Sequence, residues 1–292
     1  MRGTAKVFAY VIAGESQVPR LNQSLQFLKH FVRCDIVVIA SRCTSDIDHD
    51  QVLRPYVEPH FDDHQASILL KTGIHRVLGK VSGQYCYIDS DVIAVSSECE
   101  EIFSRKAGPV TFAADHARLD RFSRYAVRCA CQRGECEHLT QAIAEKFNIQ
   151  VLDSKWQHWN GGVFLFDSES TDFLDTWTDL TRSVFQDSFW RTRDQGTLVA
   201  SVWRHGLQHQ ALLDRRFNYI VDPWQNVSDQ ARMGKSPASY TVDRTYSLKG
   251  GSGLAHPVLL HMINGAPGTV GWKNWDDAVE LLSEAKGACT NS

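Results

Sequence analysis

The 292-residue sequence has no apolar run long enough to cross a lipid bilayer. Its longest apolar stretches, VFAYVIAG and CDIVVIAS, fall well short of the roughly 20 residues that a transmembrane helix requires. The chain also begins MRGTAKVFAY, without the charged leader, apolar segment and small-residue cleavage site of a secretion signal in that order. We therefore expect a soluble cytoplasmic protein, and membrane association is not indicated.

Positive charge is not in excess either. The sequence has no long basic run, and its formal net charge is −3. Proteins that bind nucleic acid through its phosphates usually carry a basic patch or a surplus of Lys and Arg. We therefore expect no nucleic acid partner, and we expect any ligand that carries phosphate to be bound by a few local cations.

The sequence also lacks the cysteine pattern of a small disulfide-stapled domain. Its eight cysteines are unevenly spaced in a long chain, so we expect most of them to be buried thiols. One cluster, RCACQRGECEH, gathers the zinc-ligand types Cys129, Cys131, Cys136 and His138. The spacing C-x-C-x₄-C-x-H is not a standard one for structural zinc, which argues against a zinc site here.

What the sequence does contain is an alternation of apolar, β-rich runs with helical patterns. This βαβ rhythm predicts an α/β fold with a mostly parallel, doubly wound sheet and helices on both faces. In the first half the expected strands are 5–13, 34–41 and 85–89, and the expected helices are 19–32 and 65–80. Further along we expect strands at 110–114 and 159–167, helices at 171–186 and 194–204, a polar, partly helical insertion at 117–150, and long loops over 222–256.

Two aspartates interrupt one of the apolar runs, YCYIDSDVIAV. In an extended chain alternate side chains share a face, so Asp89 and Asp91 should point the same way. Two adjacent carboxylates that stay ionised need a cation, and hard oxygen ligands suit Mg²⁺ or Mn²⁺. The alternative for an isolated Asp-x-Asp is a strand end followed by a solvated turn. Ligands of doubly wound sheets bind outside the carboxyl ends of the strands, where these residues fall.

Four later segments carry further polar or glycine residues at element ends. They are WNGGVFLFD, RDQGTLVASV, LLDRRFNYI and LLHMINGAPGTVGWKNW. Their candidate residues are Asn160, Gly161, Gly162, Asp194, Gln195, Asn218, His261, Gly265 and Lys273.

Together and in this order, these motifs resemble the retaining GT-A glycosyltransferases of the glycogenin and lipopolysaccharide galactosyltransferase type. The resemblance runs from KVFAYVIAG to GWKNW and leaves out the insertion at 117–150 and the loops at 225–255. It implies a single GT-A domain over 1–292, with a Rossmann-like sheet and the Asp-x-Asp motif at the carboxyl end of a strand. A nucleotide-binding half of about 1–115 would precede an acceptor and catalytic half of about 116–292.

The resemblance also implies roles for individual residues. Asp89, Asp91 and His261 would bind Mn²⁺ (or Mg²⁺), which bridges the two phosphates of a nucleotide-sugar. Gln195 would lie nearest the reacting carbon, Asp194 would anchor sugar hydroxyls, and Asn160 would complete the catalytic group. The implied donor-binding residues are Ala9, Tyr10, Val11, Lys71, Ser90, Gly161, Gly162, Gly265 and Lys273.

Several of these roles have an ordinary structural alternative. Tyr10 could stack on the base of the nucleotide, and Lys71 could contact the donor or be a solvated helix lysine. Lys273 stands twelve positions after His261, farther than in the family pattern, and Asn274 replaces the usual proline. Two tryptophan pairs, Trp156 with Trp159 and Trp272 with Trp275, could line the cleft or pack in the core.

The resemblance predicts transfer of a hexose, with retention of configuration, from a UDP-sugar to a carbohydrate or glycan acceptor. UDP-glucose and UDP-galactose are the commonest donors in such a family. Three alternatives remain: an Asp-x-Asp phosphatase of the haloacid dehalogenase type, a nucleotidyltransferase, and a catalytically silent nucleotide-sugar-binding protein.

Overall fold

The computed structural model describes residues 4–79, 81–131, 135–221, 229–233, 240–244, 253–255 and 257–263. Two of the expected donor-binding residues, Gly265 and Lys273, and the pair Trp272 and Trp275 lie outside the described residues.

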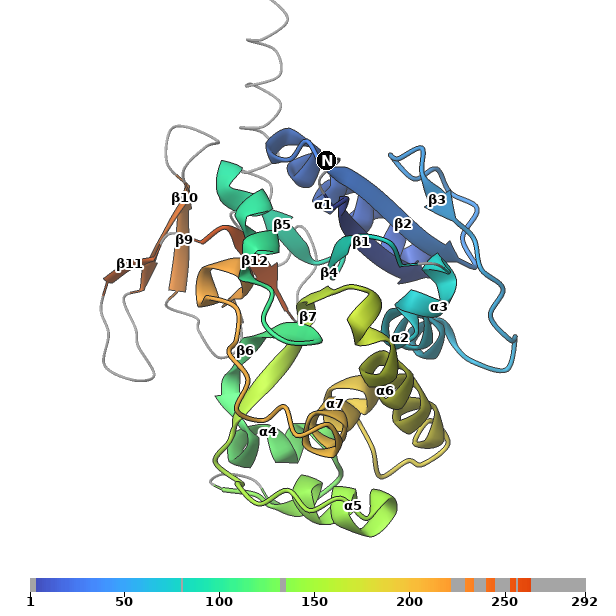
Figure 1. Ribbon diagram of the computed structural model, residues 1–292, viewed down its shortest axis with the longest axis vertical. Coiled ribbons are helices and arrows are strands. Elements are labelled where there is room, and N and C mark those ends of the chain that lie inside the picture. Colours follow the sequence, from blue (N-terminus) through green and yellow to red (C-terminus); the bar gives the residue numbers. More distant parts are fainter. Residues whose placement is uncertain are drawn as a thin grey trace, which may run out of the picture.

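The centre of the protein is a six-stranded sheet in the order β3-β2-β1-β4-β7-β6 (Figure 1). Neighbouring strands from β3 to β4 are parallel, whereas β7 runs antiparallel to both β4 and β6. One strand of the six therefore opposes the rest, and the sheet is mostly parallel as the sequence predicts. The strands are β1 (Lys6–Ala13), β2 (Asp35–Ser41), β3 (Val52–Leu53), β4 (Gln84–Ile88), β6 (Val110–Arg118) and β7 (Gln157–Phe166).

Both faces of this sheet are buried, which explains why β1 is buried from Val7 to Ala13, after the exposed Lys6 at its start. Ala9 and Val11 point into a core formed with α2, α6 and α7, whereas Phe8 and Tyr10 point into a second core formed with α1. A strand covered on both sides has no polar face to display. The helices are α1 (Val18–Phe31), α2 (Asp63–Thr72), α3 (Ile74–Leu78), α4 (Leu119–Ala126), α5 (His138–Phe147), α6 (Thr171–Ser183) and α7 (Arg193–Arg204). Short 3₁₀ helices are η1 (Glu15–Gln17), η2 (Ser97–Arg105), η3 (Ser168–Ser170) and η4 (Arg215–Asn218).

A small second sheet, β5-β12-β8, brings the far end of the described chain to the central strands. Its strands are β5 (Val92–Ala94), β8 (Tyr219–Val221) and β12 (Leu259–Met262). β12 pairs antiparallel with β5, so that His261 lies opposite Val92. This pairing decides the geometry of the site described below.

The expected strands and helices of the first half are confirmed within one or two residues, with one difference there and a second further along the chain. The expected helix 65–80 is two helices, α2 and α3, which meet at Gly73. The expected loops over 222–256 contain a three-stranded antiparallel sheet, β9 (Asp229–Met233), β10 (Tyr240–Arg244) and β11 (Gly253–Ala255). That prediction is wrong because the Gly, Ser and Pro content, averaged over the segment, hides strands of three to five residues.

The insertion at 117–150 contains α4 and α5, as its partly helical pattern predicts. Among the helices that the structure describes, none combines the length and the apolar character that a membrane span requires.

Candidate active site

A cavity of about 850 Å³ opens at the carboxyl ends of the central strands. Its walls come from β1, α1, α2, the turn between β4 and β5, the end of β6, α4, β7, the start of α7 and β12. It is lined by acidic groups and cations together, including Asp89, Asp91, Asp194, Arg20 and Lys71. The sheet topology therefore assembles here residues that lie far apart in the sequence.

Asp89 and Asp91 lie in a turn and not on one face of a strand. β4 ends at Ile88, and the backbone N–H of Val92 donates to the carbonyl of Asp89 at 3.0 Å. The chain has to turn because β4 belongs to the central sheet and β5 to the second sheet. The prediction of an extended pair is wrong. The alternative of a strand end followed by a turn is confirmed for the backbone but not for the solvation, since only 26% and 18% of the Asp89 and Asp91 side chains are exposed. Ser90, between them, is buried and lines the cavity.

His261 joins the two aspartates, as the motif order predicts. Its Nε2 lies 3.3 Å from Oδ1 of Asp91, and one potential ligand atom from each of Asp89, Asp91 and His261 lies within 4.8 Å of the others. Burial lowers the pKa of His261, but the carboxylates of Asp91 and Asp89 together outweigh burial and raise that pKa above its ordinary value. Burial raises the pKa of Asp91, but His261 outweighs it and holds the pKa below its usual range. The three side chains offer two carboxylates and one imidazole nitrogen to a single point.

A hydrogen-bond relay sets which nitrogen of His261 faces Asp91. The backbone N–H of Gly162 donates to Oδ1 of Asn160 (2.9 Å), so this oxygen is an acceptor. Asn218 must then donate its Nδ2 to the same oxygen (2.9 Å) and turn its own Oδ1 to Nδ1 of His261 (2.9 Å). Nδ1 of His261 therefore carries the hydrogen, and the lone pair of a neutral imidazole lies on Nε2, facing the aspartates. This tautomer is the one that a metal-binding Nε2 requires.

Gly162 leaves the space that His261 occupies. A Cβ on Gly162 would lie 2.2 Å from Cε1 of His261, closer than any real carbon contact. A Cβ on Gly161 would meet no atom nearer than 3.5 Å. Neither glycine is among the residues that line the cavity. The close approach at Gly162 is to His261, and the donor-binding role expected for both glycines stays a prediction.

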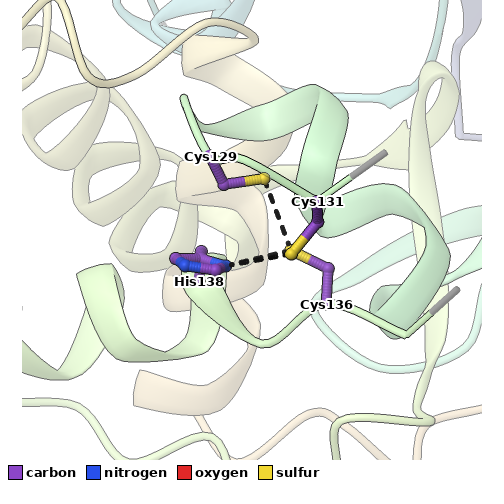
Figure 2. A group of neighbouring side chains, drawn as sticks. All are labelled: Cys129, Cys131, Cys136 and His138. Carbon is purple, nitrogen blue, oxygen red and sulfur yellow. Dashed lines mark hydrogen bonds between the residues drawn. The ribbon is translucent and has the colours of Figure 1, made fainter. Parts of the chain in front are cut away.

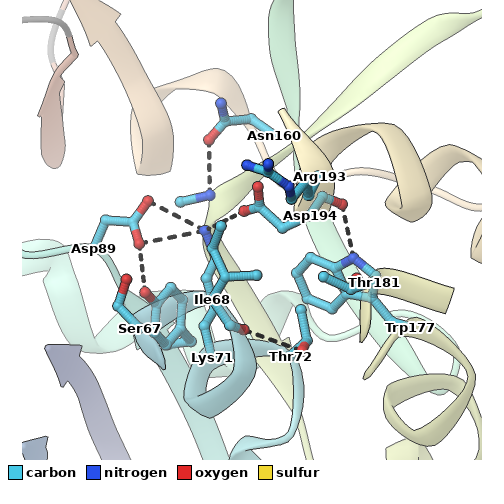
Figure 3. Close-up of polar contacts among 12 residues, drawn as sticks. Ser67, Ile68, Lys71, Thr72, Asp89, Asn160, Trp177, Thr181, Arg193 and Asp194 are labelled. Atoms are coloured by element: carbon cyan, nitrogen blue, oxygen red, sulfur yellow. Dashed lines mark hydrogen bonds and ion pairs between the residues drawn. The ribbon is translucent and has the colours of Figure 1, made fainter. Parts of the chain in front are cut away.

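Lys71 is buried between two acidic groups, so its alternative as a solvated helix lysine is wrong. Its Nζ lies 3.4 Å from Asp89 and 3.3 Å from Asp194 (Figure 3). Burial lowers the pKa of Lys71, but Asp89 and Asp194 outweigh it and raise that pKa, so the amine is charged. The hydroxyl of Tyr87 also donates to Asp89. Lys71 thus connects the aspartate turn to the first turn of α7.

Asp194 and Gln195 enter the cavity from the first turn of α7. The indole N–H of Trp177 donates to the backbone carbonyl of Asp194 at 2.8 Å, which holds this helix end (Figure 3). The amide of Gln195 satisfies both its atoms when its nitrogen faces the carbonyl of Trp159 (3.2 Å) and its oxygen faces the N–H of Gly161 (3.1 Å). Both side chains line the cavity, close to the Lys71 ammonium.

A second polar group in the cavity was missed by sequence reasoning. Asp115 accepts from Nδ2 of Asn160 at 2.9 Å and lies 3.0 Å from Nδ1 of His116. Burial raises the pKa of Asp115, but His116, His158 and Asn160 outweigh it and lower that pKa to about 2. The available signal was its place just after the expected strand 110–114, at a carboxyl end of the sheet.

The first strand contributes less than expected. Tyr10 is fully buried and its hydroxyl bonds to Oγ of Ser24 at 2.8 Å, so its ring cannot stack on a base. Ala9 is also fully buried, whereas Val11 lines the cavity. Trp156 and Trp159 are buried in the core, where their rings pack against each other at an interplanar angle of 41°. Arg20, which the sequence reasoning did not select, lines the cavity and helps to lower the pKa of Asp91.

No protein-family model matches the chain, and no curated protein sequence matches it. The solved structures that share its fold include two glycosyltransferases. The apo structure of the WbbM bifunctional glycosyltransferase matches with a TM-score of 0.57, at 12% identity, over 96% of this chain and 50% of that chain. The apo form of mouse xyloside xylosyltransferase 1 matches with a TM-score of 0.51, at 10% identity, over 90% of this chain and 99% of that chain.

These similarities concern the fold. The chain spans half the length of the WbbM protein and nearly all of the xylosyltransferase chain. They confirm the expected class, a mixed α/β protein with a mostly parallel central sheet flanked by helices.

Proposed function

We propose that this protein is a metal-dependent glycosyltransferase that moves a hexose from a nucleotide-diphospho-sugar to a glycan acceptor. The observation that carries the proposal is the meeting of Asp89, Asp91 and His261, which lie far apart in the sequence, at the edge of one cavity. The two solved structures of the same fold, both named as glycosyltransferases, support it.

The donor set fits a divalent cation. Two carboxylates favour Mn²⁺ or Mg²⁺, and the relay through Asn218 leaves the Nε2 lone pair of His261 available beside them. Three carboxylates, from Asp89, Asp91 and Asp194, outnumber the two permanent cations of this part of the cavity, Lys71 and Arg20, so the site attracts positive charge. A bound cation would neutralise the negative charge that develops on a departing nucleoside diphosphate.

Other residues of the cavity hold the donor and the acceptor around the bound cation. Lys71 holds Asp89 and Asp194 in place, and Arg20 supplies a second cation in the cavity for a diphosphate. Asp194 accepts from sugar hydroxyls, and Gln195 lies nearest the anomeric carbon, on the face opposite the leaving group. The proposal includes a UDP-hexose donor and retention of configuration. Both are supported by the resemblance of the motif order to that of retaining GT-A glycosyltransferases.

The test is a panel of nucleotide-sugars, with UDP-glucose and UDP-galactose first, incubated with Mn²⁺ or with a chelator. We expect Mn²⁺-dependent release of nucleoside diphosphate from one donor, and NMR of the transferred sugar should show a retained anomeric configuration. Release of inorganic phosphate would point to a phosphatase instead, and release of pyrophosphate from a nucleoside triphosphate to a nucleotidyltransferase.

The variant Asp91→Asn tests the ligand set itself. It should abolish Mn²⁺-dependent donor binding in calorimetry, because a ligand carboxylate is lost from the site. Asp46→Asn, which changes an exposed carboxylate outside the cavity, is the matched control and should bind as the wild type does. Unchanged donor affinity in Asp91→Asn would refute the metal assignment.

A further inference from the structure

Three cysteines and one histidine meet between α4 and α5, outside the cavity described above (Figure 2). Cys129 and Cys131 follow α4, Cys136 precedes α5, and His138 is the first residue of α5. One ligand atom from each of the four lies within 4.8 Å of the others. The unusual spacing argued against a metal site, yet the fold brings all four donors to one point.

The separations match those of ligands around one tetrahedral ion. Zn²⁺ with bonds of about 2.3 Å to sulfur and about 2.0–2.1 Å to nitrogen separates two sulfurs by about 3.8 Å, and a sulfur from a nitrogen by about 3.5 Å. Sγ of Cys129 lies 3.6 Å from Sγ of Cys136. Nδ1 of His138 lies 3.3 Å from Sγ of Cys136 and 3.7 Å from Sγ of Cys131.

The group is supported by its surroundings as metal ligands usually are. Cys136 is 3% exposed, and its backbone N–H donates to the carbonyl of Asp120 at 3.0 Å. The buried hydroxyl of Ser123 lies 3.3 Å from Sγ of Cys136 and accepts from the N–H of Leu139 at 2.9 Å. Ser123 therefore ties the sulfur to both helices, α4 and α5.

We propose that Cys129, Cys131, Cys136 and His138 bind one structural Zn²⁺ that joins α4 to α5. Four protein donors fill a tetrahedral shell and leave no open position, as in structural zinc sites. Three sulfurs and one imidazole favour zinc over Mg²⁺ or Mn²⁺. This group and the group of Asp89, Asp91 and His261 should therefore bind different ions. Each ligating thiol loses its proton to solvent as the ion binds.

The proposed ion would stabilise one wall of the cavity. α4 carries Phe122 and Tyr125, both of which line it, and the backbone N–H of Arg191, another lining residue, donates to the carbonyl of Ala126 at 2.7 Å. The proposal does not depend on glycosyl transfer, because zinc content and coordination are measured without any substrate.

The experiment measures zinc in the purified 292-residue protein by mass spectrometry and then replaces zinc with Co²⁺. Thiolate ligands give Co²⁺ a sulfur-to-metal charge-transfer absorption, which carboxylates and imidazole alone do not give. Cys136 is buried, so the test variant is Cys129→Ser with Cys131→Ser, both half-buried positions. The matched control is Cys34→Ser, a half-buried thiol outside the group.

We expect one Zn²⁺ per chain and the thiolate absorption in the wild type, in Cys34→Ser and in Asp91→Asn. The double variant should lose both the zinc and the absorption, and a chelator should lower the melting temperature of the wild type but not of the double variant. The proposal is overturned if reduced wild-type protein gives no thiolate absorption with Co²⁺. It is equally overturned if the double variant keeps its zinc, or if mass spectrometry of protein alkylated at lysis finds a Cys129–Cys136 disulfide.

Discussion

Two neighbouring glycines of β7, Gly161 and Gly162, allow a test of how Asp89, Asp91 and His261 are brought together. The test adds one methyl group to the strand. In Gly162→Ala the new Cβ would lie 2.2 Å from Cε1 and 2.8 Å from Nδ1 of His261. Carbon atoms in contact are about 3.5–4.0 Å apart, so the imidazole or a strand has to move by about 1 Å or more. Overpacking of this kind lowers the free energy of unfolding by about 1–3 kcal/mol.

The same methyl group should weaken metal binding. A displaced His261 no longer receives its fixed orientation from Asn218, and loss of such an outer contact lowers metal affinity by about 10–100-fold. Urea denaturation measures the first effect, and calorimetric titration with Mn²⁺ measures the second.

Gly161→Ala is the matched control, because its Cβ would meet no atom nearer than 3.5 Å. Because Gly161 lies inside a strand, its replacement by Ala should raise the free energy of unfolding by at most about 1 kcal/mol and leave Mn²⁺ affinity as it is. If the two variants behave alike, or if Gly162→Ala keeps wild-type stability and affinity, the steric reasoning is wrong.

Three further predictions concern single residues. Asn218→Ala should lower Mn²⁺ affinity by about 10–100-fold in the same titration, because the Nδ1–H of His261 loses its acceptor; unchanged affinity would remove the relay from the site. Gln195→Ala should lower turnover far more than donor affinity, because the side chain acts near the reacting carbon; an equal loss of both would give it a plain binding role. Burial lowers the pKa of His158 from 6.5 to about 4, so the unfolded chain binds a proton in that range that the folded chain does not. Stability is therefore lost as the pH falls from about 6.5 to about 4, by about 2 kcal/mol between about pH 7 and pH 5, and His158→Leu should remove this part of the pH dependence of urea unfolding.

Much of the fold follows from local patterns. The spacing of Leu21, Leu25 and Leu28 predicts the buried face of α1, and apolar runs bounded by helical patterns predict β1, β2 and β4. Such patterns work because burial on a sheet face or a helix stripe repeats at a fixed period.

The candidate site could be predicted only in part. The rule that ligands bind at the carboxyl ends of strands selected Asp89 and Asp91, although they meet in a turn and not along a strand. Tyr10 was misassigned, and its alternation with Ala9 and Val11 places it in the core on the other side of the sheet.

What local patterns could not supply is contact between distant segments. The relay from Gly162 through Asn160 and Asn218 to His261 exists only because β12 lies beside β5 and β8. The group of Cys129, Cys131, Cys136 and His138 could not be predicted as a metal site for the same reason. Its spacing in the sequence is not typical of zinc, and its four side chains meet only because of how α4 and α5 pack. Composition and period describe each segment, whereas the ligand sets depend on how segments pack.

The pairing of β12 with β5 also has a consequence for how the protein matures. Asp89 and Asp91 leave the ribosome early, whereas His261 arrives only after most of the chain has been synthesised. A partly folded N-terminal half can therefore hold the two carboxylates but not the complete set of donors. If the proposed ion binds at this site, its tight binding marks the end of folding, and the ion then stabilises the native state because it binds that state and not the unfolded chain.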